Sequence, residues 1–101
     1  MIRANRRLTD QLAERLTGAG CEPLREDLGF FDLCSRAVPP HALRWLIDRY
    51  VDSWQASLTE IPDDHKAQNI GRRSANLWLL SVMKQNGLPV PTGEQINELK
   101  F

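Results

Sequence analysis

The residues of this chain that could bind a metal or act as a nucleophile are Cys21, Cys34, His41 and His65. A structural zinc site usually takes its ligands in close pairs, and these four residues are widely separated. A thiol nucleophile needs a base within hydrogen-bond reach and a group that orients this base, and the sequence around either cysteine offers neither. We therefore expect no metal site, no cofactor and no enzyme activity.

The two cysteines are expected to differ in exposure and to stay reduced. Cys21 follows Gly18 and Gly20, where a loop is expected to leave the thiol accessible, whereas Cys34 fits a packed position in a helix. Two cysteines are too few for a secreted scaffold held together by disulfides. The N-terminus shows no signal-peptide pattern, and no apolar run is long enough to cross a membrane. These features predict a cytoplasmic protein.

The run from Asp63 to His65 places two carboxylates beside an imidazole, a combination that can bind a divalent cation or transfer protons. Neighbouring helical residues diverge by about 100°, so these three side chains do not converge on one atom by themselves. Carboxylates in the first turn of a helix are favoured by its dipole. Helix capping therefore explains the two aspartates better than a site does. His41 is expected to be a surface residue.

Surface recognition is the remaining source of function, and Trp45 is its best candidate. At about 100° per residue, Trp45 projects away from the apolar face of the helix expected over residues 40–59. Tryptophan and arginine are enriched where interfaces concentrate their binding energy, and Arg44 and Arg49 are near in sequence. The sequence thus predicts a partner-binding site at Trp45, Arg44 and Arg49. Coverage of Trp45 by another helix is the alternative.

Two groups of basic residues could contact nucleic acid or an acidic partner. The first is an N-terminal arm over residues 1–8 with Arg3, Arg6 and Arg7, and the second contains Arg72 and Arg73, with Asn76 nearby. The chain has 13 Lys and Arg against 13 Asp and Glu, so it lacks the net positive charge of proteins held on nucleic acid by counterion release. A solvated charge cluster is the alternative for both groups.

The elements that position these residues are predicted to be helices, because apolar residues recur at helical spacing and never alternate over a strand-length run. The 101 residues fit one domain, with the helical part over residues 9–101. Helices are expected from Thr9 to about residue 18, from Pro23 to about 38, from Pro40 to Thr59, from Pro62 to Asn86 and from Thr92 onward. Gly18 and Gly20 are expected to end the first helix, and Gly87 the fourth.

The segment from Ala75 to Met83 has seven apolar residues in nine positions, more than a one-sided surface helix needs. This density predicts a compact all-α bundle of about five helices around a central apolar helix at residues 72–86. Burial of one face of this helix in a second chain, as in a homodimer, is the alternative. Continuity of the helix through Gly71 is left open, because an internal glycine costs about 1 kcal/mol relative to alanine.

A shorter pattern overlaps the same helix. Ala67, Gly71, Leu77 and Leu80 stand at spacings that resemble those of the helix-turn-helix motif over residues 63–83. The resemblance implies a turn at Gly71 and DNA contacts from Arg72, Arg73, Ser74 and Asn76. However, such a recognition helix would expose Trp78 and Leu79 to water, at about 1.5–3 kcal/mol for each large side chain. The buried helix is therefore favoured.

The predicted function is a non-catalytic protein-interaction module: an adaptor, a chaperone-like subunit or an inhibitor. Small size, the lack of cofactor motifs and spare aromatic surface are the reasons. Stand-alone helical proteins of this size also occur among phage and mobile-element products. The expected partner is another protein, with a second copy of the chain as one alternative. A nucleic-acid-binding regulator is the alternative function.

Overall fold

The computed structural model describes residues 2–91, with side chains from residue 8 onward. This part of the chain contains four α-helices, one 3-10 helix and no strand. The α-helices are α1 (Ile2–Gly18), α2 (Arg25–Ser35), α3 (Leu43–Glu60) and α4 (Asp64–Gln85), and the 3-10 helix η1 (Pro40–Ala42) leads directly into α3. The predicted all-α class is confirmed. The count is four here instead of about five, and the helix expected from Thr92 lies outside the described residues.

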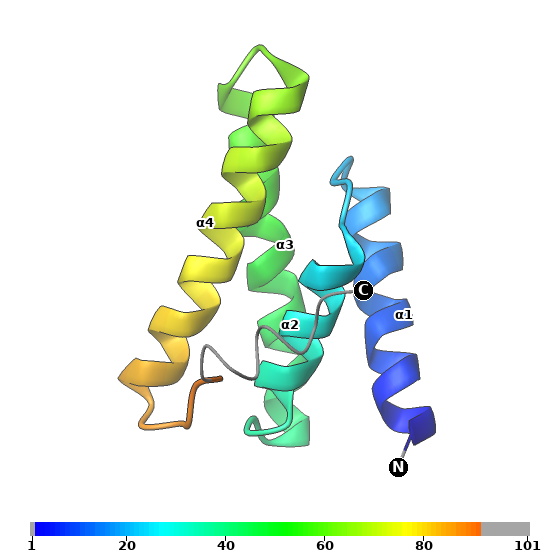
Figure 1. The fold of residues 1–101 in the computed structure, drawn as a ribbon, viewed down its shortest axis with the longest axis vertical. Coiled ribbons are helices and arrows are strands. Elements are labelled where there is room, and N and C mark those ends of the chain that lie inside the picture. Colours follow the sequence, from blue (N-terminus) through cyan, green and yellow to red (C-terminus); the bar gives the residue numbers. More distant parts are fainter. Residues whose placement is uncertain (1, 92–101) are drawn as a thin grey trace.

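Successive helices run in opposite directions along the bundle (Figure 1). A short link at residues 61–63 joins α3 to α4, and these two helices lie side by side, with α1 on the other side of α3. Helix α2 contacts both α1 and α4. The radius of gyration is 13.1 Å, close to the value of about 13 Å expected for a compact domain of this length.

Two glycines end helices as predicted. Gly20 has a φ of 85°, and the Cys21 N–H donates to the Leu16 carbonyl at 2.8 Å. Gly87 has a φ of 68°, and the Leu88 N–H donates to the Met83 carbonyl at 2.9 Å. Both ends have the Schellman geometry, in which a left-handed residue lets the following N–H reach back across the last turn.

The helix starts differ from those predicted. Helix α1 begins at Ile2, so Thr9 lies inside the helix and does not cap it. Helix α4 begins after Asp63, whose carboxylate accepts the Lys66 N–H at 2.9 Å, so the expected start with Pro62 as the first helical residue is wrong. The helix begins after Asp63 because the carboxylate of this residue accepts a backbone N–H of the first turn, which the side chain of Pro62 cannot do. The side chains of Arg3, Arg6 and Arg7 lie outside the described residues, and the separate basic arm stays a prediction.

The central helix of the bundle is α3, and the prediction that residues 72–86 form it is wrong. Tyr50 and Trp54 of α3 are fully buried, and α3 contacts α1 and α4 directly. Tyr50 also meets Phe31 of α2 edge-on, with ring centroids 5.1 Å apart. Helix α4 buries one face, which contains Ala75, Leu79 and Met83, but leaves Leu77 58% exposed. Helix α4 therefore has more apolar side chains than it packs into the core of the described residues.

Gly71 lies in the middle of α4, which continues unbroken from Asp64 to Gln85. A Cβ atom at this position would lie 2.5 Å from Cδ1 and 2.8 Å from the backbone oxygen of Trp54. Glycine is thus needed here for the close approach of α3 and α4, and no turn occurs. The alternative of a helix-turn-helix over residues 63–83, with its turn at Gly71, is therefore contradicted.

Candidate protein-interaction site

Trp45 lies in the first turns of α3, on the side that faces α4. It is 49% exposed, so no helix among the described residues covers it completely. Its ring packs against the half-buried ring of Trp78, with centroids 5.9 Å apart and planes inclined by 53°. The indole is thus fixed on one side and open to solvent on the other.

A hollow of about 360 Å³ lies beside this pair, and we call it the Trp45 groove. It forms where the segment before α3, the start of α3 and the end of α4 meet. Its lining residues are Val38, Pro39, His41, Ala42, Trp45, Leu46, Val82, Met83, Asn86 and Leu88. Most of these side chains are apolar, and the size lies within the range of about 300–1,000 Å³ typical of small binding sites. The groove can therefore accept one or two apolar side chains.

The two arginines predicted to act with Trp45 lie in different places. Arg44 lines a separate hollow of about 570 Å³ between α1 and the start of α3. Arg49 follows Trp45 by one helical turn, so it lies on the same side of α3, and it is exposed. The structure therefore brings Arg49 near Trp45 and separates Arg44 from it. His41 is exposed, as expected, and lines the Trp45 groove.

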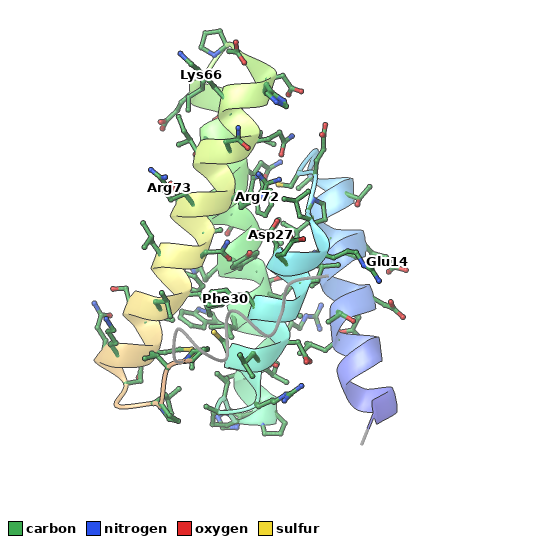
Figure 2. The ribbon with its side chains drawn as sticks, in the orientation of Figure 1. Glu14, Asp27, Phe30, Lys66, Arg72 and Arg73 are labelled. Carbon is green, nitrogen blue, oxygen red and sulfur yellow. The ribbon has the colours of Figure 1, made fainter. Side chains whose placement is uncertain are left out.

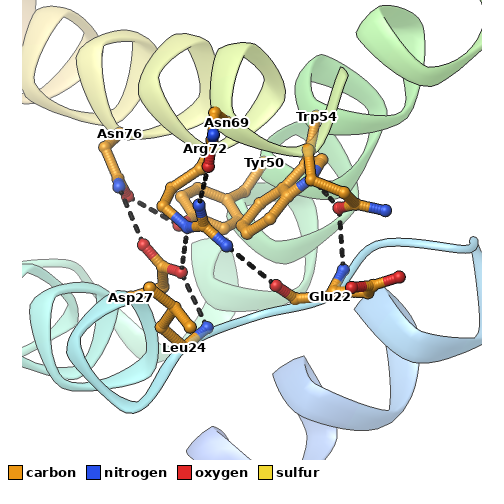
Figure 3. A network of polar contacts seen from close by, with 9 residues as sticks. Glu22, Leu24, Asp27, Tyr50, Trp54, Asn69, Arg72 and Asn76 are labelled. Atoms are coloured by element: carbon orange, nitrogen blue, oxygen red, sulfur yellow. Dashed lines mark hydrogen bonds and ion pairs between the residues drawn. The ribbon is translucent and has the colours of Figure 1, made fainter. Parts of the chain in front are cut away.

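A polar network connects α2, α3 and α4 away from the Trp45 groove, with none of the groove's lining residues in it (Figure 3). Asp27 is only 3% exposed, and its Oδ2 accepts the Leu24 N–H and the Arg72 Nε–H, both at 2.8 Å. Its Oδ1 accepts from Asn76 Nδ2 at 3.2 Å. The Asn76 Oδ1 in turn accepts the Tyr50 hydroxyl at 2.6 Å. Burial raises the pKa of Tyr50 well above its usual value, and the nearby Asp27 carboxylate raises it further. The hydroxyl therefore keeps the proton that it donates.

Arg72 makes further contacts inside the protein with both of its terminal nitrogens. Nη1 donates to the Asn69 side chain at 2.8 Å and Nη2 to the Glu22 carbonyl at 3.0 Å. The guanidinium also lies 5.3 Å from the ring centroid of Trp54. Arg72 and Asn76 thus bind other parts of this chain, whereas Arg73 is exposed on the outer side of α4 (Figure 2).

Gln68 extends the network to the loop between α1 and α2. Its Oε1 accepts from Trp54 Nε1 and from the Glu22 N–H, both at 3.0 Å, and its Nε2 donates to the Gly20 carbonyl at 2.9 Å. Both functional groups of this buried amide are satisfied, as a buried polar side chain requires. The loop at residues 19–24 is therefore anchored to α4 by hydrogen bonds.

Neither this network nor the walls of the Trp45 groove were predicted from the sequence. Asp27 and Arg72 are 45 residues apart, so no local pattern pairs them. The one signal in the sequence was the charge of Arg72. This residue lies on the side of α4 that faces the core, and a buried charge needs a partner, so an acidic residue was to be expected near it. No such signal exists for the groove, because its two sides come from segments about forty residues apart whose packing sets its shape.

The candidate nucleophiles and metal ligands are buried, cap a helix or lie apart from one another. Cys21 is buried, which corrects the expected accessible thiol, and Cys34 is buried as expected; both are free. Burial raises the pKa of Cys21 to about 11 and that of Cys34 to about 12, so both stay protonated at neutral pH. Asp63 caps α4, as the carboxylate interpretation predicted. Among the described residues, no group of three His, Cys, Asp or Glu side chains is placed to hold a metal ion.

No protein-family model, curated protein or solved structure matches this chain. Within residues 2–91, none of the helices combines the length and the apolar character that a bilayer-spanning helix needs.

Proposed function

We propose that this protein is a non-catalytic protein-interaction module that binds a partner protein through the Trp45 groove. The observation that carries the proposal is that Trp45 keeps half of its surface in water at the edge of an apolar hollow. An exposed tryptophan beside an apolar hollow is typical of an interface hot spot, where a partner's side chain completes the packing. The partner segment is expected to insert an apolar side chain beside Trp45.

The neighbouring residues Trp78 and Arg49 support this role. Trp78 packs against one face of Trp45, so the indole loses little conformational freedom when it binds. Arg49 lies one turn along the same face, where a partner's carboxylate can reach it. Adaptor, chaperone-like subunit and inhibitor are all compatible with such a surface. The expected compartment is the cytoplasm, where thiols such as Cys21 and Cys34 stay reduced.

The test is affinity capture from the native host with wild type, Trp45→Ala and Leu24→Ala. Leu24 is a matched control, because it is 48% exposed and takes no part in the groove. We expect wild type and Leu24→Ala to retain at least one protein that Trp45→Ala loses, with little dependence on salt. Equal retention by all three would refute the proposal.

Nucleic-acid binding is the competing function, and the same capture distinguishes it. Binding through phosphates would weaken steeply with salt, and Arg73→Ala would flatten that dependence, because each lost phosphate contact lowers the slope by about one. Under our proposal Arg73→Ala leaves the groove-bound protein in place.

A further inference from the structure

The outward face of α4 carries a second regular pattern, which we call the α4 seam. Its residues are Lys66, Ile70, Arg73, Leu77, Leu80 and Lys84. Successive members are four, three, four, three and four residues apart, which is the alternation that aligns side chains along the contact line of two packed helices. At about 1.5 Å per residue the seam is about 27 Å long. This length matches about three heptads of a facing helix.

The seam is open to solvent. Leu77 is 58% exposed and Ile70 is 46% exposed, while Leu80 is half-buried. Figure 2 shows Arg73 directed away from the other helices, and Lys66 lies near the first turn of α4. A shallow hollow of about 420 Å³ beside the seam is lined in part by Arg73, Leu77 and Leu80. Apolar side chains thus stand along a straight line with space beside them.

The charge of the seam is entirely positive. After Asp64, helix α4 has no acidic residue up to its end at Gln85. None of the ion pairs formed among the described residues includes Lys66, Arg73 or Lys84. Arg73 lies between Ile70 and Leu77, and Lys66 and Lys84 lie at the two ends of the seam, so a partner that covers Ile70 and Leu77 also meets positive charge without an ion-pair partner.

We propose that the α4 seam binds an acidic amphipathic helix of another protein. Leucine or isoleucine residues of that helix would pack on Ile70, Leu77 and Leu80, and its carboxylates would face Lys66, Arg73 and Lys84. This is the helix-on-helix mode of recognition, in which charge selects the partner and apolar burial supplies most of the affinity. The site is separate from the Trp45 groove, so the protein would bind two partners at once, as an adaptor does.

Charge argues against two other occupants of the seam. A second copy of α4 would bring cations against cations, which opposes pairing. An anionic membrane would attract the cations, but the seam offers it only a narrow apolar line instead of the broad face of a membrane-surface helix. An acidic helix satisfies both the charge and the shape.

The test uses two synthetic peptides of about three heptads, each with Leu at positions a and d. One has Glu and the other Lys at positions e and g. Fluorescence anisotropy of the labelled peptides is followed while the protein is added at neutral pH. We expect wild type to bind the Glu peptide at least about tenfold more tightly than the Lys peptide, because like charges across an interface are strongly unfavourable.

Three variants locate the binding. Leu77→Ala is expected to weaken binding of the Glu peptide about tenfold, as truncation of a central anchor residue does. The double variant Arg73→Glu, Lys84→Glu is expected to reverse the preference toward the Lys peptide. Trp45→Ala is expected to leave peptide binding unchanged, which separates this proposal from the one on the groove. All of these positions are exposed, and circular dichroism checks that each variant folds.

Several results would overturn the proposal. They are absence of binding to the Glu peptide, equal binding of both peptides, and loss of binding on Trp45→Ala alone. Vesicles of phosphatidylglycerol and phosphatidylcholine serve as the remaining probe. If the protein binds these vesicles and not the Glu peptide, and Leu77→Ala abolishes the vesicle binding, the seam is a membrane site.

Discussion

Asp27 shows most clearly how single residues hold this fold together. Its carboxylate is almost completely buried and accepts hydrogen bonds from Leu24, Arg72 and Asn76. A buried charge is tolerated only when partners replace the water that it has lost. The side chain of Arg72 is 20% exposed, so solvent reduces the energy of the ion pair only in part.

We predict that Arg72→Met lowers the free energy of unfolding by about 3 kcal/mol, the lower end of the range for breaking a buried pair. Methionine keeps much of the apolar stem over Trp54 and removes the charge, so the loss reports on the uncompensated Asp27. Urea unfolding followed by circular dichroism measures it. Asp27→Asn together with Arg72→Met should recover part of the loss, because the double variant leaves no buried charge.

Arg15→Ala is the control for this prediction. It breaks the pair between Arg15 and Asp48, in which the two side chains are 47% and 43% exposed. Exposed pairs contribute about 0.2–1 kcal/mol, so the effect should be small. If Arg72→Met and Arg15→Ala destabilise the protein equally, Asp27 does not depend on Arg72 as described.

The close contact between helices α3 and α4 depends on a glycine at position 71. Gly71 lies against Trp54, with too little space for a methyl group. Helix propensity alone predicts that Gly71→Ala stabilises the protein by about 1 kcal/mol. We predict the opposite sign, a loss of about 1–3 kcal/mol, because the added Cβ would force the two helices apart.

Gly18→Ala is the matched control, since Gly18 is also helical and no atom lies within 4 Å of its added Cβ. It should be neutral or slightly stabilising in the same urea unfolding experiment. Stabilisation by Gly71→Ala would show that α3 and α4 do not pack as closely as described.

The elements also show which features local sequence can predict. The glycine ends of α1 and α4 were predictable, because a Schellman end depends on a few adjacent residues. The outward direction of Trp45 was predictable from helical periodicity alone. The central position of α3 was not, since α4 has the denser apolar sequence and only packing shows that its excess apolar residues face outward. The Asp27 network and the groove depend on distant segments and were missed for the same reason.

At the scale of the whole molecule, the polar network and the Trp45 groove share no residue. The network anchors the loop at residues 19–24 through Gln68 and Arg72, and the aromatic residues of α3 fill the core beside it. The groove side carries no such network among the described residues, and most of its lining side chains are apolar. Under the proposed function, a partner in the groove would contact the core residues Leu46 and Met83, which line it, and would leave the polar network untouched.

Hydrogen exchange of the protein with its captured partner tests the groove most directly. The two walls of the groove are residues 38–46 and 82–88, which are far apart in sequence. A partner seated in the groove is expected to slow amide exchange in both segments together, and in the wild type but not in Trp45→Ala. Slowed exchange confined to other segments, or the same pattern in Trp45→Ala, would contradict the proposed function.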